Sequence, residues 1–74
     1  MPGGGIIIIS GGGGTRSADP GIVYSLQAGD GVTNAGTATA EIEQRSTPAD
    51  AWQKAAIGPG ETLAFIAAVE MRLP

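Results

Sequence analysis

Apolar and polar residues alternate with a period of two along much of the chain, which is the pattern of half-buried β-strands. The alternation is clearest over residues 37–44, where Ala40 and Ile42 face one way and glutamates the other. A second alternating segment covers residues 22–28. Turn signals rich in Gly, Pro and Asp separate these segments at intervals of about ten residues, as in small β-sandwiches. The pattern therefore predicts an all-β domain.

Two later segments are compatible with either a strand or a helix. Residues 49–57 follow a Thr-Pro pair that can open a helix, but the alternation from Trp52 to Ile57 favours a strand. Residues 62–73 contain good helix formers, yet an extended chain would place Leu63 and Phe65 on one apolar face. We interpret both segments as strands.

Four consecutive isoleucines, Ile6 to Ile9, lie between the glycine runs 3–5 and 11–14. Isoleucine favours extended backbone, whereas glycine has almost no preferred conformation. In a strand, Ile6 and Ile8 would face one way and Ile7 and Ile9 the other, so both faces need to be covered. This predicts an arm that docks on another copy or another protein.

The predicted organisation is an N-terminal arm and linker over residues 1–21 and a small β domain over residues 22–74. A 74-residue chain of this kind buries only about 60% of the surface that its unfolded form exposes. Because Cys and His are absent, neither a disulfide nor a typical zinc site can add stability. We expect a small partial β-sandwich or barrel of four or five strands, with an extended glycine-rich arm, that is completed by association.

Charge and hydrophobicity restrict the possible partners. The net charge is −3 and no stretch is basic, so nucleic acid is not an expected partner. No apolar run approaches the roughly 20 residues of a membrane helix, so a membrane is not expected either. Only 15% of the residues are charged and 42% are hydrophobic, which suggests a surface covered by protein partners or by self-association.

No residue pattern indicates catalysis, a cofactor or a metal. The stretch Gly11–Ser17 lacks the lysine and the following helix of a phosphate-binding loop, and we interpret it as a flexible hinge. Glu41 and Glu43 share one strand face, but a domain this small can enclose little of the cleft that catalytic carboxylates require. We expect a protein that is not an enzyme and has no catalytic, cofactor-binding or metal-binding residue.

The predicted interface combines the arm with three large side chains of the body. Trp52 lies near a turn and is suited to anchoring a contact, and the apolar 62–73 segment can pack a shared surface. The residues are Ile6, Ile7, Ile8, Ile9, Trp52, Leu63 and Phe65.

Two stretches, 32–42 and 57–65, resemble small immunoglobulin-like sandwich modules, with an Asn-x-Gly-Thr turn before an alternating strand and a Pro-Gly-Glu turn before the next. The small size, the absence of Cys and His, the glycine-rich segment and the β body also resemble virion structural proteins of tailed phages, of the capsid cement or decoration type. This resemblance implies location in a virion, protein partners among the capsid or other virion subunits, and no cofactor.

Two other functions remain open. The chain can be a self-associating β-oligomer, such as the base of a spike, or a small ligand-binding accessory module of a larger enzyme. Light scattering on the isolated chain separates a discrete oligomer from a monomer, and ligand-dependent stabilisation of a monomer would indicate the accessory module.

Overall fold

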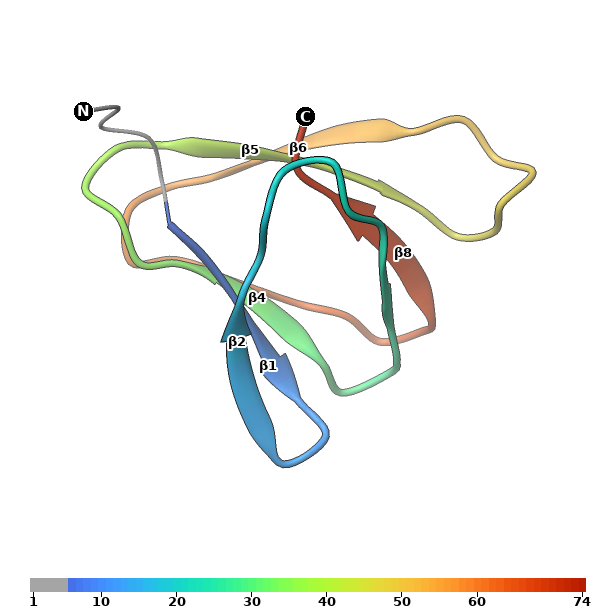
Figure 1. Ribbon diagram of the computed structural model, residues 1–74, viewed down its shortest axis with the longest axis horizontal. Helices are drawn as coiled ribbons and strands as arrows, with labels where there is room; N and C mark the ends of the chain where they lie inside the picture. The colour runs from blue at the N-terminus through green and yellow to red at the C-terminus, as the bar shows by residue number, and fades with distance from the viewer. Residues whose placement is uncertain (1–5) are drawn as a thin grey trace.

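The computed structural model describes residues 6–74. Over these residues the chain forms eight β-strands and no helix, which confirms the all-β class (Figure 1). The strands are β1 (Ile7–Gly11), β2 (Gly14–Ser17), β3 (Tyr24–Leu26), β4 (Gly31–Asn34), β5 (Ala40–Arg45), β6 (Gln53–Ile57), β7 (Thr62–Ala64) and β8 (Val69–Arg72).

The strands form two antiparallel sheets that pack as a sandwich. The first sheet has the order β2-β1-β4-β7 and the second has the order β3-β8-β5-β6. Side chains from both sheets meet in one core, and this core consists of Ile7, Ile9, Leu26, Val32, Ile42, Ile57, Phe65 and Met71. The described part of the chain therefore builds more strands, and a fuller sandwich, than the four or five that the sequence suggested.

The segment Ile6 to Ile9 is not a free arm, and this prediction was wrong. Strand β1 lies between β2 and β4 in the first sheet, with Ile7 opposite Asn34 and Ile9 opposite Val32. Only 3% of Ile7 and 4% of Ile9 are exposed. Residues 14–17 and 31–34 supply the two neighbouring strands, and the side chains of Ile7 and Ile9 are buried in the chain's own core.

The glycines after the isoleucines form a tight hairpin instead of a hinge. Gly12 and Gly13 have φ values of 61° and 88°, and they connect β1 directly to β2. Two-residue hairpin turns need positive φ at these positions, which glycine adopts without steric cost. The division into units 1–21 and 22–74 therefore fails over the described residues, because β1 and β2 share a sheet with β4 and β7.

The other strand predictions were mostly confirmed. The segments 22–28 and 52–57 contain β3 and β6, and 37–44 covers all of β5 except its last residue, so the helical alternative for 49–57 is wrong. The segment 62–73 contains two strands in different sheets, β7 and β8. The break follows Phe65, whose amide donates to Asp30 O and whose carbonyl accepts from Gly29 N, both at 2.9 Å.

Asn34 connects the two sheets through the core. Its side chain is fully buried, and Nδ2 donates to the carbonyl oxygens of Ala38 and Ile57, each at 2.8 Å. Its Oδ1 accepts a hydrogen bond from Gly36 N at 2.9 Å. A buried amide is stable in such a place because every hydrogen-bonding group has a partner. Asn34 thereby fixes the turn after β4 and holds that turn against β6.

Candidate protein-docking face

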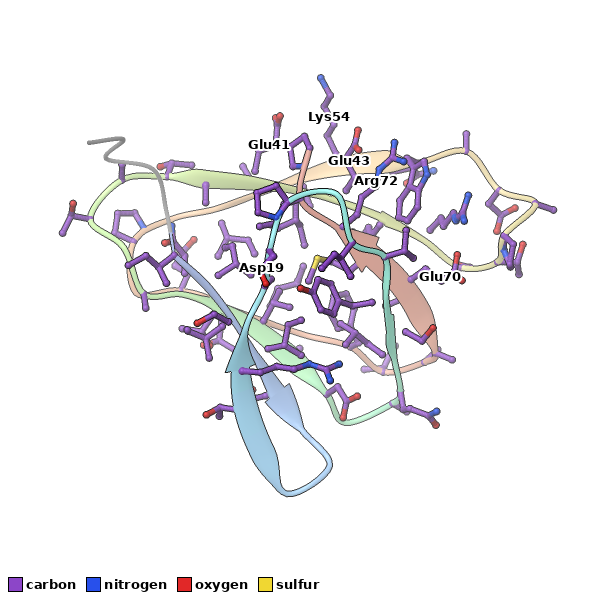
Figure 2. The ribbon with its side chains drawn as sticks, in the orientation of Figure 1. Asp19, Glu41, Glu43, Lys54, Glu70 and Arg72 are labelled. Atoms are coloured by element: carbon purple, nitrogen blue, oxygen red, sulfur yellow. The ribbon has the colours of Figure 1, made fainter. Side chains whose placement is uncertain are left out.

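The two outer faces of the sandwich differ in charge. The outer face of the second sheet carries three carboxylates and three basic groups, which are Glu41, Glu43, Glu70, Arg45, Lys54 and Arg72. Figure 2 shows Glu41, Glu43, Lys54 and Arg72 grouped along the outer side of this sheet, with Asp19 apart on the crossover between the sheets. This face is polar and close to neutral.

Much of the charge on this second face is already paired. Glu43 lies opposite Arg72 and Arg45 lies opposite Glu70, and in both pairs the arginine Nε is 2.7 Å from a glutamate Oε1. The ring of Trp52 contacts both guanidinium groups, with centroid distances of 4.1 Å to Arg45 and 4.3 Å to Arg72. Trp52 is therefore engaged by its own chain.

The outer face of the first sheet carries no charged residue among those described. One row across its four strands is Ser17, Ile8, Thr33 and Thr62, and the next is Thr15, Ser10, Gly31 and Ala64. Alternation places Ile6 beside Ile8 on this side, opposite to the buried Ile7 and Ile9. We call this surface the docking face, and it consists of Ile6, Ile8, Ser10, Thr15, Ser17, Thr33, Thr62 and Ala64.

Two isoleucines form the apolar part of the docking face. Ile6 is 55% exposed and Ile8 is half-buried between its strand neighbours. Hydroxyl groups surround them, and Thr33 Oγ1 lies 2.7 Å from Thr62 Oγ1, so these two threonines hydrogen-bond each other. Small side chains and mutually bonded hydroxyls give a surface that another layer of protein can approach closely.

Only part of the predicted interface is available to a partner. Ile7, Ile9 and Phe65 are buried in the core, and Leu63 packs against it from the inner face of β7. Their assignment to an interface was wrong, because an eight-stranded sandwich needs these side chains for its own core. Ile6 and Ile8 remain accessible. The hydroxyl residues around them were missed, since only the strand register shows that residues 15, 17, 33 and 62 share their face.

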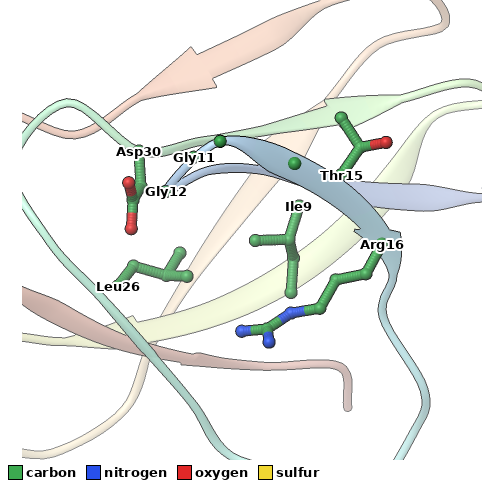
Figure 3. Close-up of a pocket in the computed structure, with 9 residues that line it drawn as sticks. Ile9, Gly11, Gly12, Thr15, Arg16, Leu26 and Asp30 are labelled. Atoms are coloured by element: carbon green, nitrogen blue, oxygen red, sulfur yellow. The ribbon is translucent and has the colours of Figure 1, made fainter.

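A groove of about 420 Å³ lies beneath the β1–β2 hairpin (Figure 3). Ile9 and Leu26 form its apolar part, and Arg16 and Asp30 supply its charged groups. Asp30 Oδ2 accepts a hydrogen bond from Gln27 N at 2.9 Å, so one oxygen of this carboxylate is used within its own turn. The Arg16 guanidinium lies 5.4 Å from the centroid of the Tyr24 ring.

Several chemical features are absent from the described residues. They contain no helix that could cross a membrane, and no group of three or more metal-ligating side chains. The glycine-rich hairpin leads into β2, where a phosphate-binding loop would continue into a helix. Comparisons with protein-family models, curated proteins and solved structures found no match.

Proposed function

We propose that the protein is a non-enzymatic structural module that attaches through its docking face to a protein subunit of a larger assembly. A virion is the setting that the sequence resemblance suggests, with the chain acting as a cement or decoration protein. The contact made by a free β-arm is replaced in this proposal by a contact through a rigid sheet face, because β1 is part of the sandwich.

The observation that supports this function is the unequal distribution of charge between the two sheets. All six charged side chains on the outer faces belong to the second sheet, and the docking face has none among the described residues. Burying a charge without a partner is costly, so the central parts of protein interfaces are depleted of charged residues. A face that lacks charge and carries two accessible isoleucines is suited to being covered.

The contact should be weak for a single copy. Complete burial of one isoleucine contributes roughly 1.5–3 kcal/mol, and association itself costs at least about 4 kcal/mol in lost freedom. Ile6 and Ile8 are already partly covered, so their contribution lies toward the lower value. Stable attachment therefore needs additional contacts around the isoleucines, or many copies bound on one particle.

The test compares Ile8→Gln with Ala56→Gln as a matched control. Both changes introduce an uncharged polar side chain on the outer side of a strand, but Ala56 lies on the second sheet, opposite Glu41. The wild-type chain is expected to co-sediment with a large assembly from the cells that produce it. Ile8→Gln should move the chain to the slow fraction and Ala56→Gln should not.

Three results would overturn the proposal. The wild-type chain sediments alone, both variants remain bound, or both are released equally. Light scattering on the isolated chain tests self-association as the alternative function. A discrete oligomer that Ile8→Gln dissociates would mean that the docking face binds another copy instead of a different subunit.

A further inference from the structure

Among residues 6–74, strand β2 forms an open edge of the first sheet. All four of its residues are exposed, and its other side pairs with β1. Ala18 N donates to Ile7 O at 2.8 Å just beyond the strand. This bond shows which residue pairs of β1 and β2 are hydrogen-bonded to each other. Bonded and non-bonded pairs alternate in an antiparallel ladder. Arg16 therefore directs its backbone groups toward β1, and Thr15 and Ser17 direct theirs outward.

The other edge strands offer less to a partner. Strands β3 and β7 are three residues long, and β6 carries the exposed side chain of Lys54 on the outer face of its sheet. Short edges and lysines are common means by which proteins prevent unwanted strand pairing. Strand β2 has neither proline nor lysine, and its one charged side chain lies on the inner face, opposite Ile9 in register. Strand β2 is therefore the edge best able to accept another strand.

The charge of Arg16 is not neutralised in the described structure. The other two arginines each form an ion pair with a glutamate, whereas no carboxylate among residues 6–74 lies within salt-bridge distance of Arg16. The guanidinium lies over Tyr24 at the open side of the sandwich and lines the groove that Ile9 and Leu26 share. A strand added beside β2 would project alternate side chains toward this guanidinium.

We propose that the β2 edge binds an extended segment of another protein that carries a carboxylate on its inward side. The backbone of the segment pairs with Thr15 and Ser17, and its carboxylate pairs with Arg16. An apolar residue two positions from the carboxylate lies on the same side and reaches toward the groove. Antiparallel pairing of two β2 edges centred on Arg16 would place like charges opposite each other, which is unfavourable. The favoured partner is therefore an acidic strand rather than a second copy of β2.

The probe is a capped peptide, Val-Thr-Glu-Thr-Val, compared with the same peptide containing Gln in place of Glu. Amide chemical shifts of the full chain are followed during titration. We expect shifts at Thr15 and Ser17, and binding of the Glu peptide roughly two- to fivefold tighter than binding of the Gln peptide at low salt. Added salt should reduce this difference, because the ion pair is partly exposed.

Two variants and two controls separate the edge from other surfaces. Thr15→Pro removes an outward N–H and should abolish binding of both peptides, while Arg16→Gln should remove only the preference for Glu. Thr62→Pro makes the matched change at an outward position of β7, and it should leave binding unchanged. Ile8→Gln should also bind both peptides normally. The result therefore does not depend on whether the docking face binds a partner.

Other outcomes would overturn the strand-acceptor proposal. It would be contradicted by chemical-shift changes located at residues other than Thr15 and Ser17. Equal binding of both peptides to the wild type, or unchanged binding to folded Thr15→Pro, would also contradict it. Concentration-dependent shifts at Thr15 and Ser17 without peptide would show that another copy occupies this edge.

Discussion

Glu43 and Arg72 lie directly opposite each other on β5 and β8, with Oε1 and Nε 2.7 Å apart, and the Arg72 guanidinium also contacts the Trp52 ring. Arg45 repeats this arrangement with Glu70 on the neighbouring pair of positions and contacts the same ring. The Trp52 ring, at the end of the β5–β6 connection, is thus held against the outer side of the second sheet by two guanidinium groups.

We expect Trp52→Ala to destabilise the fold because one ring supports two guanidinium groups. Each contact of this kind contributes about 0.5–1 kcal/mol at an accessible site, so the loss should be about 1–2 kcal/mol before the change in buried area is included. Urea unfolding measures this loss. Trp52→Phe keeps an aromatic face and should recover part of the stability. Equal stability of the alanine variant and wild type would show that the stack contributes nothing.

Ile6 and Ile7 provide the sharpest distinction between an integrated strand and a free arm. Ile7 is buried in the core and Ile6 is 55% exposed. Ile7→Ala should cost about 2–5 kcal/mol, as truncations of large aliphatic side chains in cores do. Ile6→Ala should change the free energy of unfolding by at most about 0.5 kcal/mol, because surface substitutions have small effects. Denaturant unfolding of the two variants provides the measurement. Small losses in the free energy of unfolding for both variants would favour a free arm instead of an integrated strand.

The strand alternation was readable from the sequence, but the partners of the strands were not. Residues 37–44 showed the correct inward side because Ala40 and Ile42 alternate with charged residues. Residues 31–34 were not recognised as a strand, and Gly31 and Asn34 are both poor strand formers. Distant contacts decide their structure: a side chain at Gly31 would meet the backbone of Leu63 closely, and the Asn34 amide bonds to Ile57 O.

The candidate surface was predictable only in part for the same reason. Alternation shows that Ile6 and Ile8 oppose Ile7 and Ile9, but it does not show which pair faces the core. That choice depends on where β4 lies, and β4 was not recognised. The Trp52 stack was equally hidden, because it needs Arg45 and Arg72 to become neighbours on adjacent strands. The Gly12-Gly13 pair was a usable signal for the hairpin, since two glycines between extended segments are typical of such turns.

Asn34 should be the most sensitive polar position of the fold. Its side chain makes three hydrogen bonds, to Ala38 O, Ile57 O and Gly36 N, and it connects the first sheet to the last residue of β6. Asn34→Ala would leave these three backbone groups without their partner, and the loss at the buried Ile57 O alone should cost about 1–3 kcal/mol. For a chain of this size, such a loss is a large fraction of the total stability.

Asn34→Asp tests whether the hydrogen bonds or the volume of this side chain matter. The substitution keeps the acceptor for Gly36 N but replaces the two N–H donors with an oxygen that faces the Ala38 and Ile57 carbonyl groups. An ionised Asp would also place an unpaired charge in the core, which is strongly unfavourable. We therefore expect Asn34→Asp to be at least as destabilising as Asn34→Ala at neutral pH, as measured by thermal unfolding. A near-wild-type melting temperature for the aspartate variant would show that the inter-sheet hydrogen bonds do not hold the sandwich together.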